Sequence, residues 1–176
     1  MTRLGSLSKS GSDARTPPSG GSSTLLAWID CGRPSVDIAR GRQRVYWHDP
    51  VVIPVASDEI DLNWSFNNIC AFDGPSYHTM NWFSASGWLI TNYDSYGLLD
   101  DLNGQWVLGK GDSYYLNLGY PYGFPACTSP ITANVRTNQV YGYYDGSVSW
   151  TYSADLVGPA CQYLLSLVIE REHTVN

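Results

Sequence analysis

Apolar and polar residues alternate along much of the middle of the chain, the pattern of strands that are half-buried in antiparallel sheets. The clearest run spans residues 59–66, where Ile60, Leu62, Trp64 and Phe66 fall on one face and four polar residues on the other. This period of two predicts that one face packs on a core while the other meets solvent. Further strands are expected at 24–29, 44–47, 51–55, 80–83, 88–91, 105–108, 114–118 and 131–135.

Two dipeptides mark tight turns between such segments. Asp145-Gly146 separates residues 140–144 from 147–152, and both flanking segments are rich in aromatic and β-branched residues. Asn103-Gly104 stands directly before the expected strand at 105–108. Both dipeptides favour the positive φ values of a type I′ turn, so each predicts a β-hairpin.

The last apolar stretch, residues 161–169, fits either a helix or a strand. Its apolar residues recur at helical spacing after Gly158-Pro159, yet a continuous apolar run also suits a strand buried on both faces. We favour the strand. With about ten strands, hardly any helix and long Gly- and Pro-rich connections such as 119–130, the chain is expected to be all-β, an antiparallel two-sheet sandwich with a jelly roll as one variant.

The first 23 residues differ from the rest in composition. They are rich in Ser, Gly and Pro and lack the apolar surface that would offset the entropy of ordering them. Any order in this segment must therefore come from a surface that it lies against. We expect an extended arm over residues 1–23 and a single β-sandwich domain over residues 24–176, which is the size of one ordinary domain.

The amino-acid composition is typical of a β-sandwich, or of a protein whose surface is covered by a neighbouring subunit. The chain has 7 Trp, 13 Tyr and 4 Phe, while charged residues make up only 15% of its 176 residues. No run approaches the roughly 20 apolar residues that a membrane-spanning helix needs, and the start of the chain has no apolar segment typical of a signal peptide. We therefore expect no membrane span.

Charge is divided unequally along the chain, although its net value is −6. Residues 1–44 carry seven Lys and Arg against three Asp, whereas residues 45–176 carry three Lys and Arg against thirteen carboxylates. A basic arm on an acidic body can dock on the next subunit or bind nucleic acid. The arm's basic residues, Arg3, Lys9 and Arg15, are sparse for a nucleic-acid-binding segment, which favours docking.

The four cysteines, Cys31, Cys70, Cys127 and Cys161, are too widely spaced to predict a zinc site. Two disulfides are compatible with their number, but without a signal peptide we expect buried free thiols.

Hard oxygen ligands of the kind that calcium prefers occur in two short acidic segments. They are Asp58, Glu59 and Asp61 in the first, and Asp100, Asp101 and Asn103 in the second. Neither segment matches the sequence pattern of an EF-hand loop. We therefore expect no cofactor, and calcium bound between subunits is the alternative.

Catalytic motifs are not evident in the sequence. His48, His78 and His173 stand outside any motif of a nucleophile, a zinc-binding helix or a phosphate-binding loop. Glu170 and Glu172 could face one way on a strand and act as the carboxylate pair of a glycoside-acting enzyme, but we favour a solvated face at the end of the last strand. We expect that the protein is not an enzyme.

Aromatic residues in loop-like segments supply the candidate contact surface. Tyr93, Tyr96, Tyr120, Tyr122 and Phe124 lie among Gly, Pro, Asn and Asp residues. Exposed rings could contact another protein, stack on a sugar ring, or cover the open ends of the sandwich.

Together these features predict a structural subunit of a viral or phage particle: a capsid, minor capsid or decoration protein. It would assemble through its arm and its aromatic loops. Its partners would be copies of itself or other particle subunits, and it would reside in the virion after assembly in the host cytoplasm. The alternative is a carbohydrate-binding or receptor-binding β-sandwich module, for example on a phage fibre. Fold alone does not decide between them.

Overall fold

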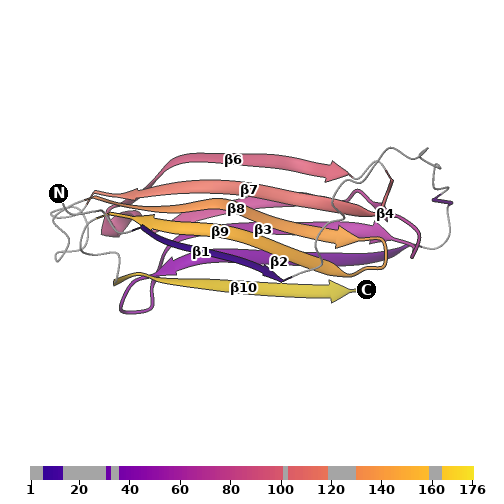
Figure 1. Ribbon diagram of the computed structural model, residues 1–176, viewed down its shortest axis with the longest axis horizontal. Coiled ribbons are helices and arrows are strands. Elements are labelled where there is room, and N and C mark those ends of the chain that lie inside the picture. The colour runs from indigo at the N-terminus through magenta and orange to yellow at the C-terminus, as the bar shows by residue number, and fades with distance from the viewer. Residues whose placement is uncertain (1–5, 14–30, 33–35, 101–102, 119–129, 159–163) are drawn as a thin grey trace.

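Ten β-strands and one 3₁₀ turn, η1 (Ser84–Ser86), form the regular structure of the described residues in this computed structural model (Figure 1). The described residues are 6–13, 31–32, 36–100, 103–118, 130–158 and 164–176. The chain is an all-β two-sheet sandwich, as the sequence predicts. The strands are β1 (Ser6–Asp13), β2 (Asp37–His48), β3 (Pro54–Phe66), β4 (Ala71–Phe72), β5 (Ser76–Trp82), β6 (Trp88–Asp100), β7 (Trp106–Asn117), β8 (Ile131–Tyr143), β9 (Val148–Val157) and β10 (Ser166–Val175).

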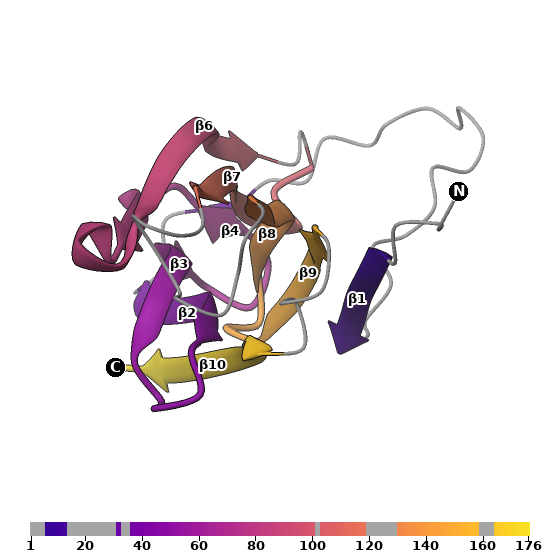
Figure 2. The same cartoon turned by 90° about the vertical axis from the view of Figure 1, so that its left-hand side faces the viewer.

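All strand pairings are antiparallel. The first sheet has the order β1-β9-β8-β7-β6, and the second has the order β10-β2-β3-β4 with β5 also paired to β3. Successive strands β6 to β9 therefore form a meander within one sheet. A jelly roll instead contains two Greek keys, so the jelly-roll variant is wrong for the described strands. Figure 2 shows the two layers nearly end-on, with β1 beyond β9 at the edge of the first sheet.

The strands are longer than the apolar pattern predicts. The expected strands at 105–108 and 114–118 are the two ends of β7, and those at 131–135 and 140–144 belong to β8, whose last residue is Tyr143. Pairing between β7 and β8 keeps each strand extended across its polar middle. The expected strand at 51–55 is mostly a turn, because β3 begins only at Pro54, and 24–29 lies outside the described residues.

Both predicted turns join paired strands. Gly146 has φ of +77° in the turn between β8 and β9, but Asp145 is not among the residues with positive φ, so the hairpin is present while the expected type I′ turn, which needs positive φ at both residues, is wrong. Asn103 and Gly104 lie between β6 and β7, which also pair. The strand expected in the last apolar stretch is confirmed as β10, although it begins at Ser166 and continues to Val175.

A disulfide between Cys31 and Cys70 corrects the expectation of free thiols for these two residues. The Asn67 side-chain amide binds the backbone of both cysteines. It donates to the Cys31 carbonyl at 2.7 Å and accepts from the Cys70 backbone N–H at 2.8 Å. The sulfurs meet because this turn presents the two backbones to each other, a relation that spacing along the chain does not reveal. Cys127 and Cys161 lie outside the described residues.

The core formed by the described residues consists of two hydrophobic clusters along the length of the sandwich. One contains Trp47, Trp88 and Tyr115, and the other is built around Trp64. The Trp64 indole N–H donates to the Tyr143 carbonyl at 3.0 Å, which satisfies the polar atom of a side chain that is 1% exposed. Between the two clusters lies a layer of buried polar residues.

Candidate functional site

Strand β1 forms the edge of the first sheet by pairing with β9 of the same chain. The register runs from Ser6 opposite Val157 to Asp13 opposite Trp150. Of the three basic residues expected in the arm, Lys9 lies on β1 opposite Ala154, while Arg3 and Arg15 fall outside the described residues. The surface that orders this part of the arm is therefore β9.

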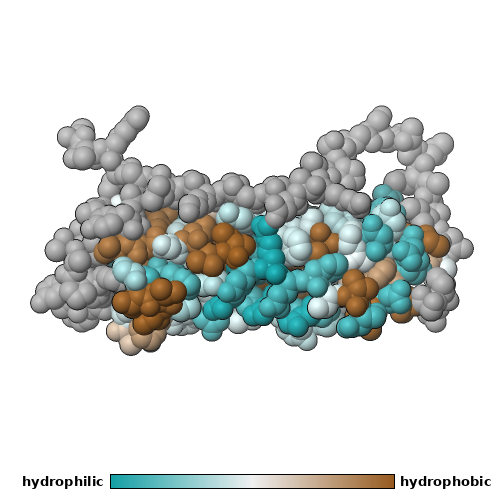
Figure 3. All heavy atoms as spheres, turned by 90° about the horizontal axis from the view of Figure 1, so that it is seen from below, coloured by the Kyte–Doolittle hydropathy of each residue, from teal (hydrophilic) through white to brown (hydrophobic). Residues whose placement is uncertain are grey.

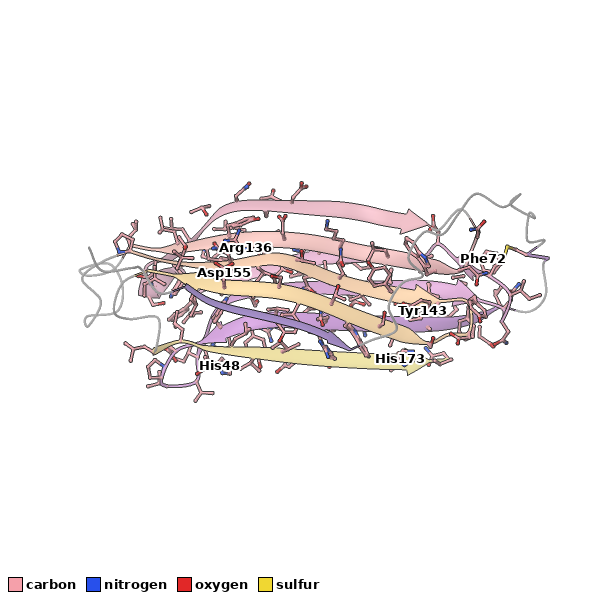
Figure 4. All side chains as sticks on the ribbon, in the orientation of Figure 1. His48, Phe72, Arg136, Tyr143, Asp155 and His173 are labelled. Atoms are coloured by element: carbon pink, nitrogen blue, oxygen red, sulfur yellow. A yellow bond between two sulfur atoms is a disulfide. The ribbon has the colours of Figure 1, made fainter. Side chains whose placement is uncertain are left out.

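Strand β9 is fixed on its other side, independently of β1. Asp155 is 3% exposed and accepts hydrogen bonds from Asn134 at 3.2 Å and from Arg136, both on β8 (Figure 4). The hydrogen bond to Asp155 raises the pKa of Arg136. On the inner face, Ala154 and Leu156 are buried in the core. The strand that receives β1 is thus held by hydrogen bonds and packing to which β1 does not contribute.

The predicted aromatic contact surface is only partly within the described residues. Tyr93 lies on β6 and is 56% exposed, and Tyr96 lies on the same strand. Tyr120, Tyr122 and Phe124 lie outside the described residues. Tyr93 alone can therefore be identified as an exposed ring of this set.

Arginines alternate along the outer face of β2 and lie between acidic residues of β3 and β10. Arg40 forms a two-pronged ion pair with Asp61. Arg42 donates to Glu59 at 2.8 Å and to Glu172 at 3.3 Å, and these contacts raise its pKa. Viewed from below, hydrophilic residues occupy the middle of the molecule and hydrophobic ones gather toward its ends (Figure 3).

The third arginine of this row, Arg44, is less completely paired. Its guanidinium nitrogens lie 3.9 Å from Glu59 and 3.8 Å from Glu170, beyond hydrogen-bond length, and its carbon lies 4.6 Å from the centre of the Tyr46 ring. The Tyr46 hydroxyl donates to Glu170, and this bond is the main cause of a raised Tyr46 pKa.

These ion pairs account for two features of the sequence. Arg40, Arg42 and Arg44 lie on β2, outside the arm expected over residues 1–23, and carboxylates on β3 and β10 neutralise their charge. Glu170 and Glu172 do pair with alternate residues of β2 and face one way, but each is engaged by an arginine. Their arrangement is accounted for by charge pairing across the sheet.

The first acidic segment does not converge on a cation. Strand alternation turns Asp58 into the sandwich, while Glu59 and Asp61 face outward and bind arginines. Over the described ranges, no group of three or more His, Cys, Asp or Glu side chains could hold a metal ion. In the second segment Asp101 lies outside these ranges. Within one chain, the first segment therefore does not form a calcium site.

A continuous chain of side-chain hydrogen bonds crosses the sandwich between the two hydrophobic clusters. Arg171 on β10 donates to Gln43 on β2 at 2.9 Å, and Gln43 donates to Asn138 on β8 at 2.8 Å. Asn138 donates to Asp58 on β3 at 2.7 Å, and the other Asp58 oxygen lies 2.7 Å from His78 Nε2 on β5. We call these five residues the polar layer.

Apart from Arg171, which is partly exposed, the side chains of the polar layer are almost completely shielded from water. Gln43, Asp58 and Asn138 are each 0% exposed, and the His78 side chain is 5% exposed. Gly111 on β7 gives the imidazole its space, since a Cβ there would lie 2.6 Å from His78 Cε1. Sequence reasoning missed this layer because its members lie on four strands of one sheet and one of the other, and each resembles a surface residue.

A shallow pocket lies at the end of the second sheet where β2 turns into β3. It has a volume of about 170 Å³ and is lined by Arg44, Pro54, Ala56, Ser57, Asn81, Trp82 and Phe83. Trp82 and Phe83 are 43% and 42% exposed, whereas Ser57 is 2% exposed. The Ser57 hydroxyl and the Arg44 Nε are buried without a hydrogen-bond partner among the described residues. Its lining comes from three separate strands, so no local motif could have indicated it.

In comparisons with known proteins, no family model matches the chain, and neither a curated protein nor a solved structure matches it. Among the described residues, no helix is long and apolar enough to cross a membrane.

Proposed function

We propose that this protein is a structural subunit of an ordered particle, of viral or phage type, in which β1 of one copy pairs with β9 of another. The observation that carries the proposal is the attachment of β1. Among the described strands it pairs with β9 alone, as the end strand of its sheet. Partners in this function are copies of the same chain or other particle subunits, and the expected location is the virion assembled in the host cytoplasm.

The composition of β1 makes it a weak strand that is easily exchanged. Its sequence, SLSKSGSD, contains one apolar residue and none of the β-branched or aromatic residues that favour strands. Its backbone ladder to β9 is therefore the main source of its attachment. Backbone hydrogen bonds do not depend on which chain supplies the strand, so a second copy can make the same ladder.

Residues 14–30 link β1 to Cys31, which the disulfide to Cys70 ties to the body, and they allow this exchange. At roughly 3.3 Å per extended residue, a link of this length reaches up to about 55 Å, enough to cross to a neighbouring subunit. Reciprocal exchange would give a closed pair, whereas exchange in one direction around a ring would give a larger closed assembly. An uncovered β9 would expose a sheet edge, so exchange also protects it.

A mixing experiment tests exchange directly, because Ser10 and Ser153 face each other across the ladder. One full-length variant carries Ser10→Cys, the other carries Ser153→Cys, and the two are mixed before mild oxidation. Since the new cysteines are on different chains, a cross-link between them forms only when β1 of one copy lies on β9 of another. Mass spectrometry of the linked peptide identifies it, and each variant oxidised alone is the control. Absence of this peptide in an assembled sample refutes the exchange.

Two proline variants supply a matched pair. On an edge strand, the N–H groups of neighbouring residues point alternately toward the partner strand and toward solvent. Of Ser8→Pro and Lys9→Pro, one therefore removes a ladder bond and the other does not. Size distribution by sedimentation should show one assembling and one non-assembling variant. If both assemble as the unchanged protein does, β1 is not the connection between subunits.

A further inference from the structure

We infer that the turn between β2 and β3 binds membranes by inserting its apolar tip into the surface of a zwitterionic lipid bilayer. This inference is independent of the exchange of β1, and it requires no membrane span. The turn comprises residues 49–53, and Val51 and Val52 at its tip are 71% and 68% exposed. Ile53 and the nearby Phe83, whose N–H bonds to β3, are also exposed. A group of apolar side chains held outside the core indicates a surface that another molecule covers.

The backbone of the turn is strained in the conformation that presents these side chains. Val52 has φ of +64°, a region that Gly and Asn enter readily and that crowds a β-branched side chain. A tight hairpin turn ordinarily places glycine at such a position. Strained residues of this kind cluster at functional sites. The presence of valine where glycine would be relaxed therefore favours a role for its side chain.

The turn can leave water at low cost, because its backbone donors are already bonded within it. Asp49 Oδ1 accepts from the N–H groups of Val51 at 3.0 Å and of Ile53 at 2.8 Å. The Asp49 carbonyl accepts from the Val52 N–H at 3.0 Å, and the Asp49 N–H donates to the Ile53 carbonyl at 3.1 Å. Pro50 has no N–H to satisfy. An unbonded backbone donor is costly in lipid, and the described turn from residue 49 to 53 contains none.

Charged residues are sparse in the segments that reach this end of the sandwich. Residues 50–57, 74–93, 113–135 and 156–169 contain no Asp, Glu, Lys or Arg. They include the strand ends beside the turn: the starts of β3, β6, β8 and β10 and the ends of β5, β7 and β9 (Figure 1). Because charge is expensive to bring into lipid and basic residues are what attract anionic lipid, this composition fits a bilayer without net charge.

The shape of the tip favours lipid over a protein partner. The turn lies beyond the last residue pair of β2 and β3, His48 with Pro54, and it protrudes from the body at the lower left of Figure 1. A protein partner would need a groove that matches this convex surface, whereas lipid chains rearrange around it. Insertion to the interfacial depth of about 5–10 Å would leave the two sheets in water.

Flotation of the full-length protein with phosphatidylcholine vesicles tests the inference. We expect protein to float with the vesicles equally at low and high salt, because apolar burial is not screened as charge attraction is. Val51→Asp should weaken vesicle binding about tenfold or more, since it removes an apolar side chain from the tip and places a carboxylate there.

Val52→Gly separates membrane binding from folding. Glycine adopts φ of +64° without strain, so this variant should unfold at the same urea concentration as the unchanged protein or at a higher one. Its binding to vesicles should nevertheless fall about threefold or more, because the apolar side chain is gone. A merely structural role for Val52 would not produce weaker binding in an equally stable protein.

Ile69→Asp is the matched control for Val51→Asp. Ile69 is 46% exposed in the turn between β3 and β4, at the opposite end of the sandwich, so its replacement should leave vesicle binding unchanged. The inference is overturned if the unchanged protein does not float, if the two aspartate variants behave alike, or if flotation needs anionic lipid and disappears at high salt. It is also overturned if Val51→Asp abolishes self-association in lipid-free sedimentation and vesicles are not bound, since a second copy would then cover the tip.

Discussion

Replacing Asn138 with leucine should destabilise the protein by about 3 kcal/mol, although the two side chains are similar in size. Asn138 lies at the middle of the polar layer, where it donates to Asp58 at 2.7 Å and accepts from Gln43 at 2.8 Å. Leucine removes these bonds, together with the longer ones from the Asn138 amide to the backbone carbonyls of Asp58 at 3.2 Å and Gln43 at 3.4 Å, and creates no large cavity. The effect therefore reports hydrogen bonding rather than packing.

The magnitude follows from the two partners that remain. A lost hydrogen bond to a charged group costs about 1.5–3 kcal/mol, and Asp58 is 0% exposed, so water cannot replace it. The lost bond to Gln43 adds about 1 kcal/mol, moderated because the same Gln43 nitrogen also donates to the Thr151 carbonyl at 2.8 Å. At about 2–4 °C per kcal/mol, the melting temperature should fall by about 6–12 °C.

Urea unfolding followed by tryptophan fluorescence measures the free energy of unfolding, with the slope on urea concentration as a check on cooperativity. Asn92→Leu is the control, because Asn92 is exposed on β6, and it should stay within about 0.5 kcal/mol of the unchanged protein. A loss below about 1 kcal/mol for Asn138→Leu, with an unchanged slope, would show that the polar layer is not a connected network.

Two further predictions concern covalent and ionisable groups. Cys31→Ser with Cys70→Ser should lower the free energy of unfolding by up to about 4 kcal/mol, the chain-entropy value for the sequence separation of 39 residues, and unfolding of the unchanged protein with and without reductant checks it. Burial raises the pKa of Asp112, so its carboxyl favours folding at low pH and loses that contribution as pH rises through the folded-state pKa. Asp112→Asn should therefore stabilise the protein at pH 7 and lose this advantage below about pH 4, as urea unfolding at both pH values would reveal.

The sequence predicts the strands whose inner faces are uniformly apolar. Ile60, Leu62, Trp64 and Phe66 all lie in the core, and the Asp145-Gly146 dipeptide lies in a turn between paired strands, with Gly146 at positive φ. In both cases the information is local. A run of alternating residues or a dipeptide specifies the conformation without knowledge of distant neighbours.

Features that depend on distant segments could not be predicted. The middle of β7 contains Gly109, Lys110 and Gly111, which have low strand preference, and cross-strand pairing with β8 keeps this segment extended. Gln43 and Asn138 resemble solvent-facing residues because the partners that make their burial tolerable come from other strands. The same holds for the pocket, whose polar and aromatic residues meet only in the folded sheet.

The polar layer also determines how the two sheets are aligned along their length. Apolar packing has no preferred direction, so two hydrophobic faces could slide past one another by one strand repeat and still bury similar area. Such a slide would bring Val140, two residues along β8 from Asn138, opposite the Asp58 carboxylate. A buried carboxylate facing a valine would lose its donor, which makes the shifted alignment unfavourable. A few buried hydrogen bonds thus select a single fit between two surfaces that hydrophobicity alone would leave free to slip.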